Sequence, residues 1–443
     1  MSSITALNAR WVLPMQPAST VLPQHTLIIQ DEQIADLLPE AQARQRYPQA
    51  YWLDFPNHAL LPGLVNAHTH AAMSLFRGLG SDRSLHDWLQ SYIWPAEAKY
   101  VDEDFVTLGS QLAIAEMLRS GTTCFNDMYL FPEATARVVQ DSGIRAVLGL
   151  IVIEFPTQWA KTAQDYFERG NALFNTWQGY SRLHFALAPH APYTVSDASL
   201  REILELAQQR EIPIHMHVHE TQQEVESALH EHQERPLARL QRLGLLDHPF
   251  AAVHMTQLTP DEQQLLRDHP LVSVVHCPES NLKLASGFCP VAELYKHNIT
   301  VALGTDGAAS NNDLDMLGEI RTAALLAKGV AGDATALNAI QALEMATLQG
   351  ARALGLEDRI GSLTPGKFAD VIAIDLSSLE CLPTHDPHTQ IVYAATREDV
   401  SDVFVAGRQL LSKRQLTTMD EHALRTEVQA WHASHPLGQS HAH

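Results

Sequence analysis

The chain has 443 residues, of which 45% are hydrophobic and 18% charged, and these values are typical of a folded globular protein rather than a disordered one. Its 30 Lys and Arg residues stand against 51 Asp and Glu residues, so the formal net charge is −21. Such an acidic chain repels phosphate backbones, which argues against nucleic acid as a partner and favours a neutral, zwitterionic or cationic small molecule. The length favours one large barrel with an added domain.

The cellular setting is indicated by what the sequence lacks. Its four cysteines are widely spaced without a CxxC pair, which is typical of reduced thiols in a cytoplasmic protein. The first residues contain no long apolar segment of a secretory signal, and no run of 18 apolar residues predicts a membrane span. The tail HASHPLGQSHAH is rich in histidine but irregular, so we expect a solvated terminus there rather than a metal site.

Both ends of the chain contain short strand-like segments separated by turns. TALNARWVLP and HTLIIQDEQIADLLP lie near the N-terminus, and PGKFADVIAIDL and SDVFVAGRQLL lie near the C-terminus. They precede and follow a region of different character. We therefore expect residues 1–60 and 363–443 to form one small β-sandwich built from both chain ends, with a tail.

The middle of the chain alternates short apolar runs with amphipathic stretches. Helical periodicity is clearest at residues 102–119, 132–142, 197–209 and 313–326. This alternation predicts βα units and a parallel sheet, and eight units within residues 61–362 predict a closed (β/α)8 TIM barrel. A doubly wound sheet is the alternative, but no GxGxxG follows an early strand. The expected strands lie near residues 59–65, 122–125, 146–151, 184–188, 212–218, 251–253, 272–275 and 300–303.

Side chains that can bind metal ions follow these strands. The first strand leads into NAHTH, in which His68 and His70 point to the same face because residues i and i+2 of a strand do so. Barrel enzymes place their chemistry at the carboxyl ends of the strands. The fourth to eighth strands end near His190, the group His215, His217 and His219, then His254, His276 and Asp306.

A single metal ion fits this set of side chains. Zn²⁺ favours imidazole and carboxylate ligands and keeps an open position for water in catalytic sites. His68, His70, one histidine of the fifth strand and Asp306 would supply four ligands. No lysine ends the fourth strand, so a carbamylated lysine bridging two ions is not available. The other histidines have simpler interpretations: His215 and His219 as structural or supporting groups, and His276 as a core histidine.

Several motifs resemble one known family. LPGLVNAHTH, the HxxE spacing of His217 and Glu220, His254, PESNLKLASG and LGTDGAASNN are similar to the amidohydrolase superfamily, and within it to the 5'-methylthioadenosine/S-adenosylhomocysteine deaminases. The similarity covers nearly the whole chain. PESNLKLASG and GTDGAASNN are specific to this branch and its triazine-hydrolase relatives, whereas HxH alone is not.

The resemblance implies a role for each candidate residue. A divalent ion, Zn²⁺ with Fe²⁺ or Mn²⁺ as alternatives, would activate water for attack on C6 of a purine nucleoside, and homo-dimers or tetramers are common among such barrels. Asp306 would accept the proton of that water, His254 would orient the water, and Glu220 would protonate the ring nitrogen N1. Ribose contacts are implied for Glu97, a second substrate contact for His190 and an aromatic wall for Trp88. The implied metal ligands are His68, His70, His217 and Asp306.

The substrate follows from a departure from the family pattern. Family members that accept S-adenosylhomocysteine carry arginines for its carboxylate, one of them five residues after the arginine of an R-A-x-L segment. Here that position holds Leu150, and the following loop offers Lys161 but no arginine. We therefore expect 5'-methylthioadenosine to be preferred, adenosine to be weaker and S-adenosylhomocysteine poor.

Two other functions remain open from the sequence. A triazine or ammeline chlorohydrolase, or another purine or pyrimidine deaminase, would share the metal core, although a bare triazine gives Glu97 nothing to bind. A barrel that serves only as a scaffold should have lost ligands, and here every ligand position is filled.

Overall fold

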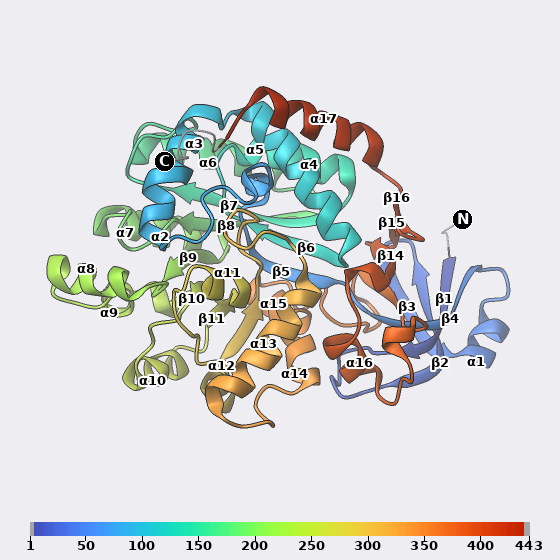
Figure 1. Cartoon of the computed structure of the whole chain (residues 1–443). Coiled ribbons are helices and arrows are strands. Elements are labelled where there is room, and N and C mark those ends of the chain that lie inside the picture. The colour runs from blue at the N-terminus through green and yellow to red at the C-terminus, as the bar shows by residue number, and fades with distance from the viewer. Residues whose placement is uncertain (1–3, 438–443) are drawn as a thin grey trace.

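The computed structural model describes residues 4–437, and its strands form two sheets of eight strands each (Figure 1). In one sheet every pair of sequential neighbours is parallel. This is the predicted (β/α)8 barrel, and the prediction is confirmed. Its strands are β5 (Leu64–Thr69), β6 (Thr122–Asp127), β7 (Arg145–Val152), β8 (Leu183–Pro189), β9 (Ile214–Val218), β10 (Phe250–His254), β11 (Val272–His276) and β12 (Thr300–Leu303).

The barrel closes where its last strand meets its first. Asn66 Nδ2 donates to Thr305 Oγ1 over 2.7 Å, and Thr305 N donates back to Asn66 Oδ1 over 3.0 Å. Asp306 N donates to the carbonyl of His68 over 3.0 Å. Gly304 permits this approach, because a Cβ there would lie 2.8 Å from the backbone nitrogen of His68. The seam therefore brings the NAHTH and GTDG motifs into direct contact.

The interior of the barrel is filled by small side chains from alternate strand positions. Cys124, Val147, Ala251 and Val253 belong to this inner cluster. The positions next to them, such as Phe125, Leu148 and Ala252, belong to the larger cluster that includes the helices, as expected from the period of two in a strand. The inner side chains are short, so the strands can approach one another around a packed core rather than a pore.

Polar residues set the starts of the barrel helices. Asp102, Thr162, Ser196, Thr221 and Thr259 each accept a backbone N–H of the following turn. The main helices are α4 (Glu103–Arg119), α5 (Pro132–Ser142), α6 (Ala163–Trp177), α7 (Asp197–Arg210), α8 (Gln222–His232), α9 (Pro236–Arg242), α10 (Pro260–Asp268), α11 (Pro278–Lys283), α12 (Val291–Lys296), α13 (Met316–Ala331), α14 (Ala339–Met345) and α15 (Leu348–Ala353).

One expected helix is displaced. Residues 313–326 were expected to be helical, but α13 begins at Met316, because Asp315 caps it by accepting the N–H of Leu317. It continues to Ala331 and ends at Gly332, which has a φ of +62°. Four short elements cover the carboxyl end of β5 before α4 begins, and none of them was predicted: η1 (Ala71–Phe76), α2 (Leu85–Trp88), η2 (Leu89–Ile93) and α3 (Trp94–Tyr100).

The second sheet joins the two chain ends, as predicted. In it β4 (Tyr51–Pro62) of the N-terminal segment pairs antiparallel with β13 (Val371–Asp375) of the C-terminal segment, with Pro62 opposite Val371. The order of this sheet is β16 (Gln415–Leu416), β15 (Arg408–Ser412), β14 (Val400–Val405), β13, β4, β1 (Ile4–Val12), β2 (Leu22–Gln30) and β3 (Gln33–Pro39). Figure 1 shows the blue and red strands side by side, next to the barrel, whose α4 contacts β14, β15 and β16.

The expected strand at residues 59–65 is divided between the two sheets. Residues up to Pro62 belong to β4, and β5 begins at Leu64. Gly63 lies between them, directly against β6, because a Cβ at this position would meet Thr123 Oγ1 at 2.0 Å. A single apolar run therefore serves two sheets, which its composition alone does not reveal.

A buried ion pair links the sheet to the barrel. The Arg145 guanidinium donates to both carboxylate oxygens of Asp370, over 2.8 and 3.1 Å, and both side chains are almost fully buried. Asp370 also accepts the N–H of Ala406 over 2.7 Å. Since each charged oxygen has a donor, the pair satisfies the condition under which buried charges are tolerated.

The C-terminal segment also returns to the barrel. After β13, α16 (Pro387–Tyr393) lies near α13 and α14, and α17 (Glu421–Ser434) lies along α4 (Figure 1). The rings of Trp431 and Phe105 meet at 5.4 Å between centroids. In the histidine-rich tail the His435 ring stacks on Trp431, and residues 438–443 lie outside the described part of the chain. Within residues 4–437, the helices are all too short or too polar to cross a membrane.

Candidate metal centre and active site

Four of the predicted side chains meet at the carboxyl ends of β5, β9 and β12. The Nε2 atoms of His68 and His217 are 3.2 Å apart. Asp306 Oδ1 lies 3.4 Å from His68 Nε2 and 3.2 Å from His70 Nε2. Potential ligand atoms of His68, His70 and His217 all lie within 4.8 Å of one another. The structure thus assembles three imidazoles and a carboxylate around one point.

The outer nitrogen of each imidazole has a hydrogen-bond partner. His70 Nδ1 donates to the carbonyl of Met128 over 2.6 Å, and His217 Nδ1 donates to the carbonyl of His190 over 2.7 Å. Because a carbonyl only accepts, the Nε2 atoms of these two rings, when neutral, turn a lone pair toward the centre, as metal-binding histidines do. His68 Nδ1 is hydrogen-bonded to His215 Nε2 over 3.0 Å.

This donor set suits a divalent cation. Burial lowers the pKa of His68 and holds that of His217 well below its usual value, so both rings are neutral. Three imidazoles and a carboxylate that converge at such short separations are a donor set that suits a cation. Burial opposes ionisation of Asp306, whereas the nearby imidazoles of His68 and His70 favour it and hold its pKa well below its usual range. Nitrogen and carboxylate ligands of this kind fit Zn²⁺.

The Asp306 carboxylate is held in place by its own neighbours. Oδ2 accepts from Ser280 Oγ over 2.7 Å and from Ser310 Oγ over 2.9 Å, and Oδ1 accepts the N–H of Gly307 over 2.8 Å. The PESN and GAASNN motifs supply the two serines. They leave Oδ1 turned toward the histidines.

His254 differs from the three histidines that share the centre. The Asn281 amide donates to its Nδ1 over 3.0 Å, so the ring proton is on Nε2, which lies 3.7 Å from Glu220 Oε2. Burial lowers the pKa of His254 to about 3, which makes the ring a neutral hydrogen-bond donor. His68, His254 and Asp306 also approach closely enough to hold an ion, but this proton disfavours His254 as a ligand.

The surroundings of Glu220 favour its protonated form. It follows β9 at the start of the turn into α8, and its side chain is buried. Burial first, and then the charges of Asp306 and Glu224, hold its pKa well above the usual range. A carboxyl group with a raised pKa beside the four converging side chains is suited to act as a general acid.

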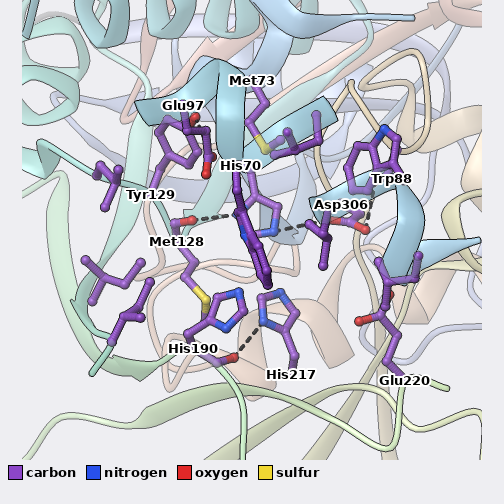
Figure 2. Close-up of a pocket in the computed structure, with 18 of the residues that line it drawn as sticks. His70, Met73, Trp88, Glu97, Met128, Tyr129, His190, His217, Glu220 and Asp306 are labelled. Atoms are coloured by element: carbon purple, nitrogen blue, oxygen red, sulfur yellow. Dashed lines mark hydrogen bonds and ion pairs between the residues drawn. The ribbon is translucent and has the colours of Figure 1, made fainter. Parts of the chain in front are cut away.

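A cavity next to the four converging side chains contains the other predicted residues. Trp88, Glu97 and His190 line it together with His70, His217 and Asp306. Figure 2 shows Glu97 beside Tyr129 on one side of the histidines and Glu220 on the opposite side. Tyr129 Oη donates to Glu97 Oε1 over 2.9 Å, and burial raises the pKa of Glu97 to about 7. The Trp88 indole N–H donates to the carbonyl of Leu79 over 2.9 Å.

The three remaining histidines do not enter the cavity wall. His215 supports His68 from behind, as described above. The His219 ring turns away, with Nε2 accepting the N–H of Leu237 over 3.2 Å. His276 is fully buried, and burial lowers its pKa to about 3. The simpler interpretations of these residues agree with these positions.

The position assigned to Leu150 was wrong. This side chain packs outward against α6, because a Cβ at Gly170 would meet Leu150 Cβ at 3.4 Å. The residues of β7 and the following loop that line the cavity are Ile151, Ile153, Phe155 and Thr157. Since side chains alternate along a strand, an offset of one residue moved the assignment to the other face. Lys161 does not line the cavity: it is exposed, and its Nζ donates to the carbonyl of Thr157, a residue of the cavity wall.

Sequence reasoning also missed several contributing residues. Tyr129 lies two residues after the end of β6, a strand for which the sequence suggested no polar site residue. Asn281 and Ser280 lie inside the quoted PESN motif, so a role could have been suspected but not assigned. Their partners, His254 and Asp306, are 27 and 26 residues away in sequence.

Comparison with known proteins places this geometry in a family. The Amidohydrolase family is matched by residues 59–410. The chain belongs to the amidohydrolase family. Among amidohydrolases, a 5-methylthioadenosine/S-adenosylhomocysteine deaminase of Teredinibacter turnerae is 46% identical over 426 residues, covering 96% of each chain. A protein of the same name from Thermodesulfovibrio yellowstonii is 39% identical and covers 97% of this chain and 98% of that one.

Solved amidohydrolase structures agree with this placement. An adenosine deaminase of Xanthomonas campestris with bound zinc is 49% identical, has a TM-score of 0.95 and covers 97% of this chain and 98% of that one. Atrazine chlorohydrolase of Arthrobacter aurescens, also with zinc, has a TM-score of 0.90 at 21% identity, covering 96% and 99%. The second likeness concerns the fold alone. The prediction of an amidohydrolase related to the deaminases is therefore confirmed.

Proposed function

We propose that this amidohydrolase is a metal-dependent deaminase that converts 5'-methylthioadenosine and water to the inosine-type nucleoside and ammonia. One observation carries the proposal: a single cavity holds a centre of four potential ligands, a buried carboxyl group at Glu220 whose pKa is raised and, on the opposite side, the Glu97 carboxyl group. The deaminase names of relatives at 39–46% identity support it.

His68, His70, His217 and Asp306 would hold one divalent cation. Zinc is the ion we favour, because the ligands are mainly imidazole and because the structure from Xanthomonas campestris contains zinc. When bound, such a cation lowers the pKa of a water molecule from 15.7 toward about 7 and so supplies a nucleophile at neutral pH.

The protein's own groups would move the protons. Glu220 donates its proton to N1 of the purine, which makes C6 accept electrons. Asp306 accepts a proton from the attacking water, and the Nε2–H of His254 donates a hydrogen bond to the oxygen that adds to C6. The C6–N bond then breaks as Asp306 passes its proton to the amino group, which leaves as ammonia, and the hydroxyl group on C6 gives its proton to Glu220 as the carbonyl forms. Positioned acids and bases contribute roughly 10²–10⁴-fold each.

The opposite side of the cavity would bind the sugar. The Glu97 carboxylate, held by Tyr129, can accept hydrogen bonds from the ribose hydroxyls. Trp88 would contact the purine, and His190 would make a second substrate contact. Glu97 also favours a nucleoside over a triazine, which has no hydroxyl groups to offer.

The apolar lining suits a small apolar 5' substituent. Leu130, Ile151, Ile153 and Phe155 form part of the wall, and none of the described residues that line the cavity is Lys or Arg. A methylthio group can be buried there, whereas the carboxylate of S-adenosylhomocysteine would lose water without gaining a cationic partner. We therefore propose the order 5'-methylthioadenosine, then adenosine, then S-adenosylhomocysteine.

We also propose that the enzyme works in the cytoplasm and as a homo-oligomer. The four cysteines are all free and buried, which suits a reducing compartment. Dimers and tetramers are common among symmetric soluble oligomers and among barrels of this type. Size-exclusion chromatography with light scattering measures the oligomeric state directly.

The test of the proposed activity is ammonia release. Purified protein is incubated with 5'-methylthioadenosine as prepared, after removal of metal by a chelator, and after zinc is returned. We expect release that the chelator abolishes and zinc restores. Atrazine is assayed in parallel for chloride release. Chloride from atrazine without ammonia from any nucleoside would replace the deaminase with the chlorohydrolase alternative.

A further inference from the structure

A second buried glutamate holds the backbone that carries Glu220. Glu224 Oε1 accepts the N–H of His219 over 3.0 Å, and Glu224 Oε2 accepts the N–H of Glu220 over 2.7 Å. Each carboxylate oxygen thus binds one of two successive backbone donors. Glu224 is buried on the first turn of α8. The backbone N–H of Glu224 donates to Thr221 Oγ1 over 3.2 Å.

The need for this carboxylate lies in the turn before it. β9 ends at Val218, and His219 then adopts a φ of +54°, in the left-handed region that side chains other than glycine rarely occupy. This bend lets the His219 ring turn away from the cavity, while Glu220, the next residue, lines it. Successive N–H groups in such a bend converge on one point and form a concave site for an anion. Glu224 supplies the anion from within the chain.

The carbonyl groups of the same two residues are held from the other side. Thr256 N donates to the carbonyl of His219 over 3.0 Å, and Thr256 Oγ1 donates to the carbonyl of Glu220 over 2.7 Å. Thr256 follows β10 by two residues, close to His254. The main chain of residues 219 and 220 is therefore fixed by α8 and by the loop after β10 together.

The side chain of Glu220, in contrast, makes no hydrogen bond to any group in residues 4–437. Its nearest ion-pair partner, His254 Nε2, is 3.7 Å away. The direction of this carboxyl group is therefore set by the backbone on which it stands. We propose that Glu224, assisted by Thr256, is a positioning residue that aims the Glu220 carboxyl group at the ring nitrogen it protonates. This inference rests on the proposed deaminase function.

The experiment compares variants of α8 and of the β10 loop in the full-length, zinc-loaded protein. Glu224→Ala removes both acceptors, and Glu224→Gln keeps one, so the milder variant is available if Glu224→Ala does not fold. Thr256→Val removes the hydroxyl donor, and Thr256→Ser retains it. Val225→Ala, a buried neighbour, controls for lost packing, and Glu226→Ala, an exposed glutamate of the same helix, controls for lost charge.

Four quantities are measured with 5'-methylthioadenosine: kcat, KM, zinc content and hydrogen exchange of the amides at residues 219–221. We expect Glu224→Ala to exchange these amides faster and to lose about 10²-fold in kcat, since misplacement of a catalytic group by about 1 Å has that effect. Zinc content and KM should change little. Glu224→Gln and Thr256→Val should fall between Glu224→Ala and wild type, and Thr256→Ser should recover the wild-type kcat.

Two failures can be told apart. A wild-type protein that releases no ammonia from any of the three nucleosides would refute the proposed function, and this inference with it. An active wild type whose Glu224 variants keep the kcat of Val225→Ala, or lose zinc as they lose activity, would overturn the positioning role alone.

Discussion

The two sides of the cavity are built in different ways. On the side of the four converging ligands, polar groups lie at or just after barrel strands, and their outer atoms are hydrogen-bonded, as with His70 to Met128 and Asp306 to two serines. The opposite side is formed largely by connecting segments, with apolar side chains such as Trp94 and Ile153 around the single carboxyl group of Glu97. A rigid strand end suits chemistry, whereas a connection can change without disturbing the barrel. Substitutions on the two sides should therefore have different kinetic signatures.

The largest effect is expected at the seam of the barrel. His68→Ala removes a ligand that contacts both His217 and Asp306, so we expect zinc and deaminase activity to be lost together. Metal analysis and ammonia release on one preparation measure both. A variant that kept its full zinc content and its activity would show that His68 is not a required metal ligand, and would contradict the proposed four-ligand centre.

Glu220→Gln should separate metal binding from proton transfer. The amide cannot donate the carboxyl proton to N1, so kcat should fall by roughly 10²–10⁴-fold while zinc content stays unchanged. Activity within about tenfold of wild type would show that another group protonates the ring.

Glu97→Ala tests the opposite side. The loss of charge-assisted hydrogen bonds of about 1.5–3 kcal/mol should lower kcat/KM for 5'-methylthioadenosine by tens to hundreds of fold, with zinc retained. An unchanged kcat/KM would mean that the ribose hydroxyls bind elsewhere.

The two thioether substrates sharpen the comparison further. None of the described residues that line the cavity is Lys or Arg, so the carboxylate of S-adenosylhomocysteine would lack a cationic partner. Its kcat/KM should therefore be at least about tenfold below that of 5'-methylthioadenosine, which corresponds to the loss of one charge-assisted hydrogen bond. The same protein preparation serves for both assays. Equal efficiencies would require a cation to reach the cavity in the complex.

The smallest effect is a dependence on pH. Burial raises the pKa of Glu97 to about 7, so its ionised form, the better acceptor for ribose hydroxyls, is lost as the pH falls through that value. KM should therefore increase below about pH 7, by up to about tenfold per unit. Glu97→Gln, which cannot titrate, should lack this rise in KM. If the variant shows the same rise, the titrating group is not Glu97.

The features that could be predicted from the sequence depend on local spacing. The HxH pair and the order of residues after the strands predicted His68, His70, one histidine of the fifth strand and Asp306 as ligands, and strand–helix alternation predicted the barrel. These patterns follow from the period of a strand and from the convergence of parallel strands at one end. The choice of His217, and with it Glu220, came from the family resemblance.

The features that escaped prediction depend on contacts between distant segments. No spacing links Asn281 to His254 or Thr256 to Glu220, because these partners meet only after the barrel closes. The assignment of Leu150 failed for a different reason. The position was found by counting five residues from Arg145, and such a count does not say which face of β7 a side chain occupies. Ile151, not Leu150, lines the cavity.

The pairing of β4 with β13 bears on how the protein is made. During synthesis β4 emerges more than 300 residues before its antiparallel neighbour, since Pro62 pairs with Val371. Until then one edge of the sheet is open to pairing with other chains, and the buried Arg145 guanidinium has no Asp370 to neutralise it. A chain truncated before Asp370 should therefore aggregate rather than yield an isolated barrel. The segment from Asp370 onward is thus required for the barrel itself to fold.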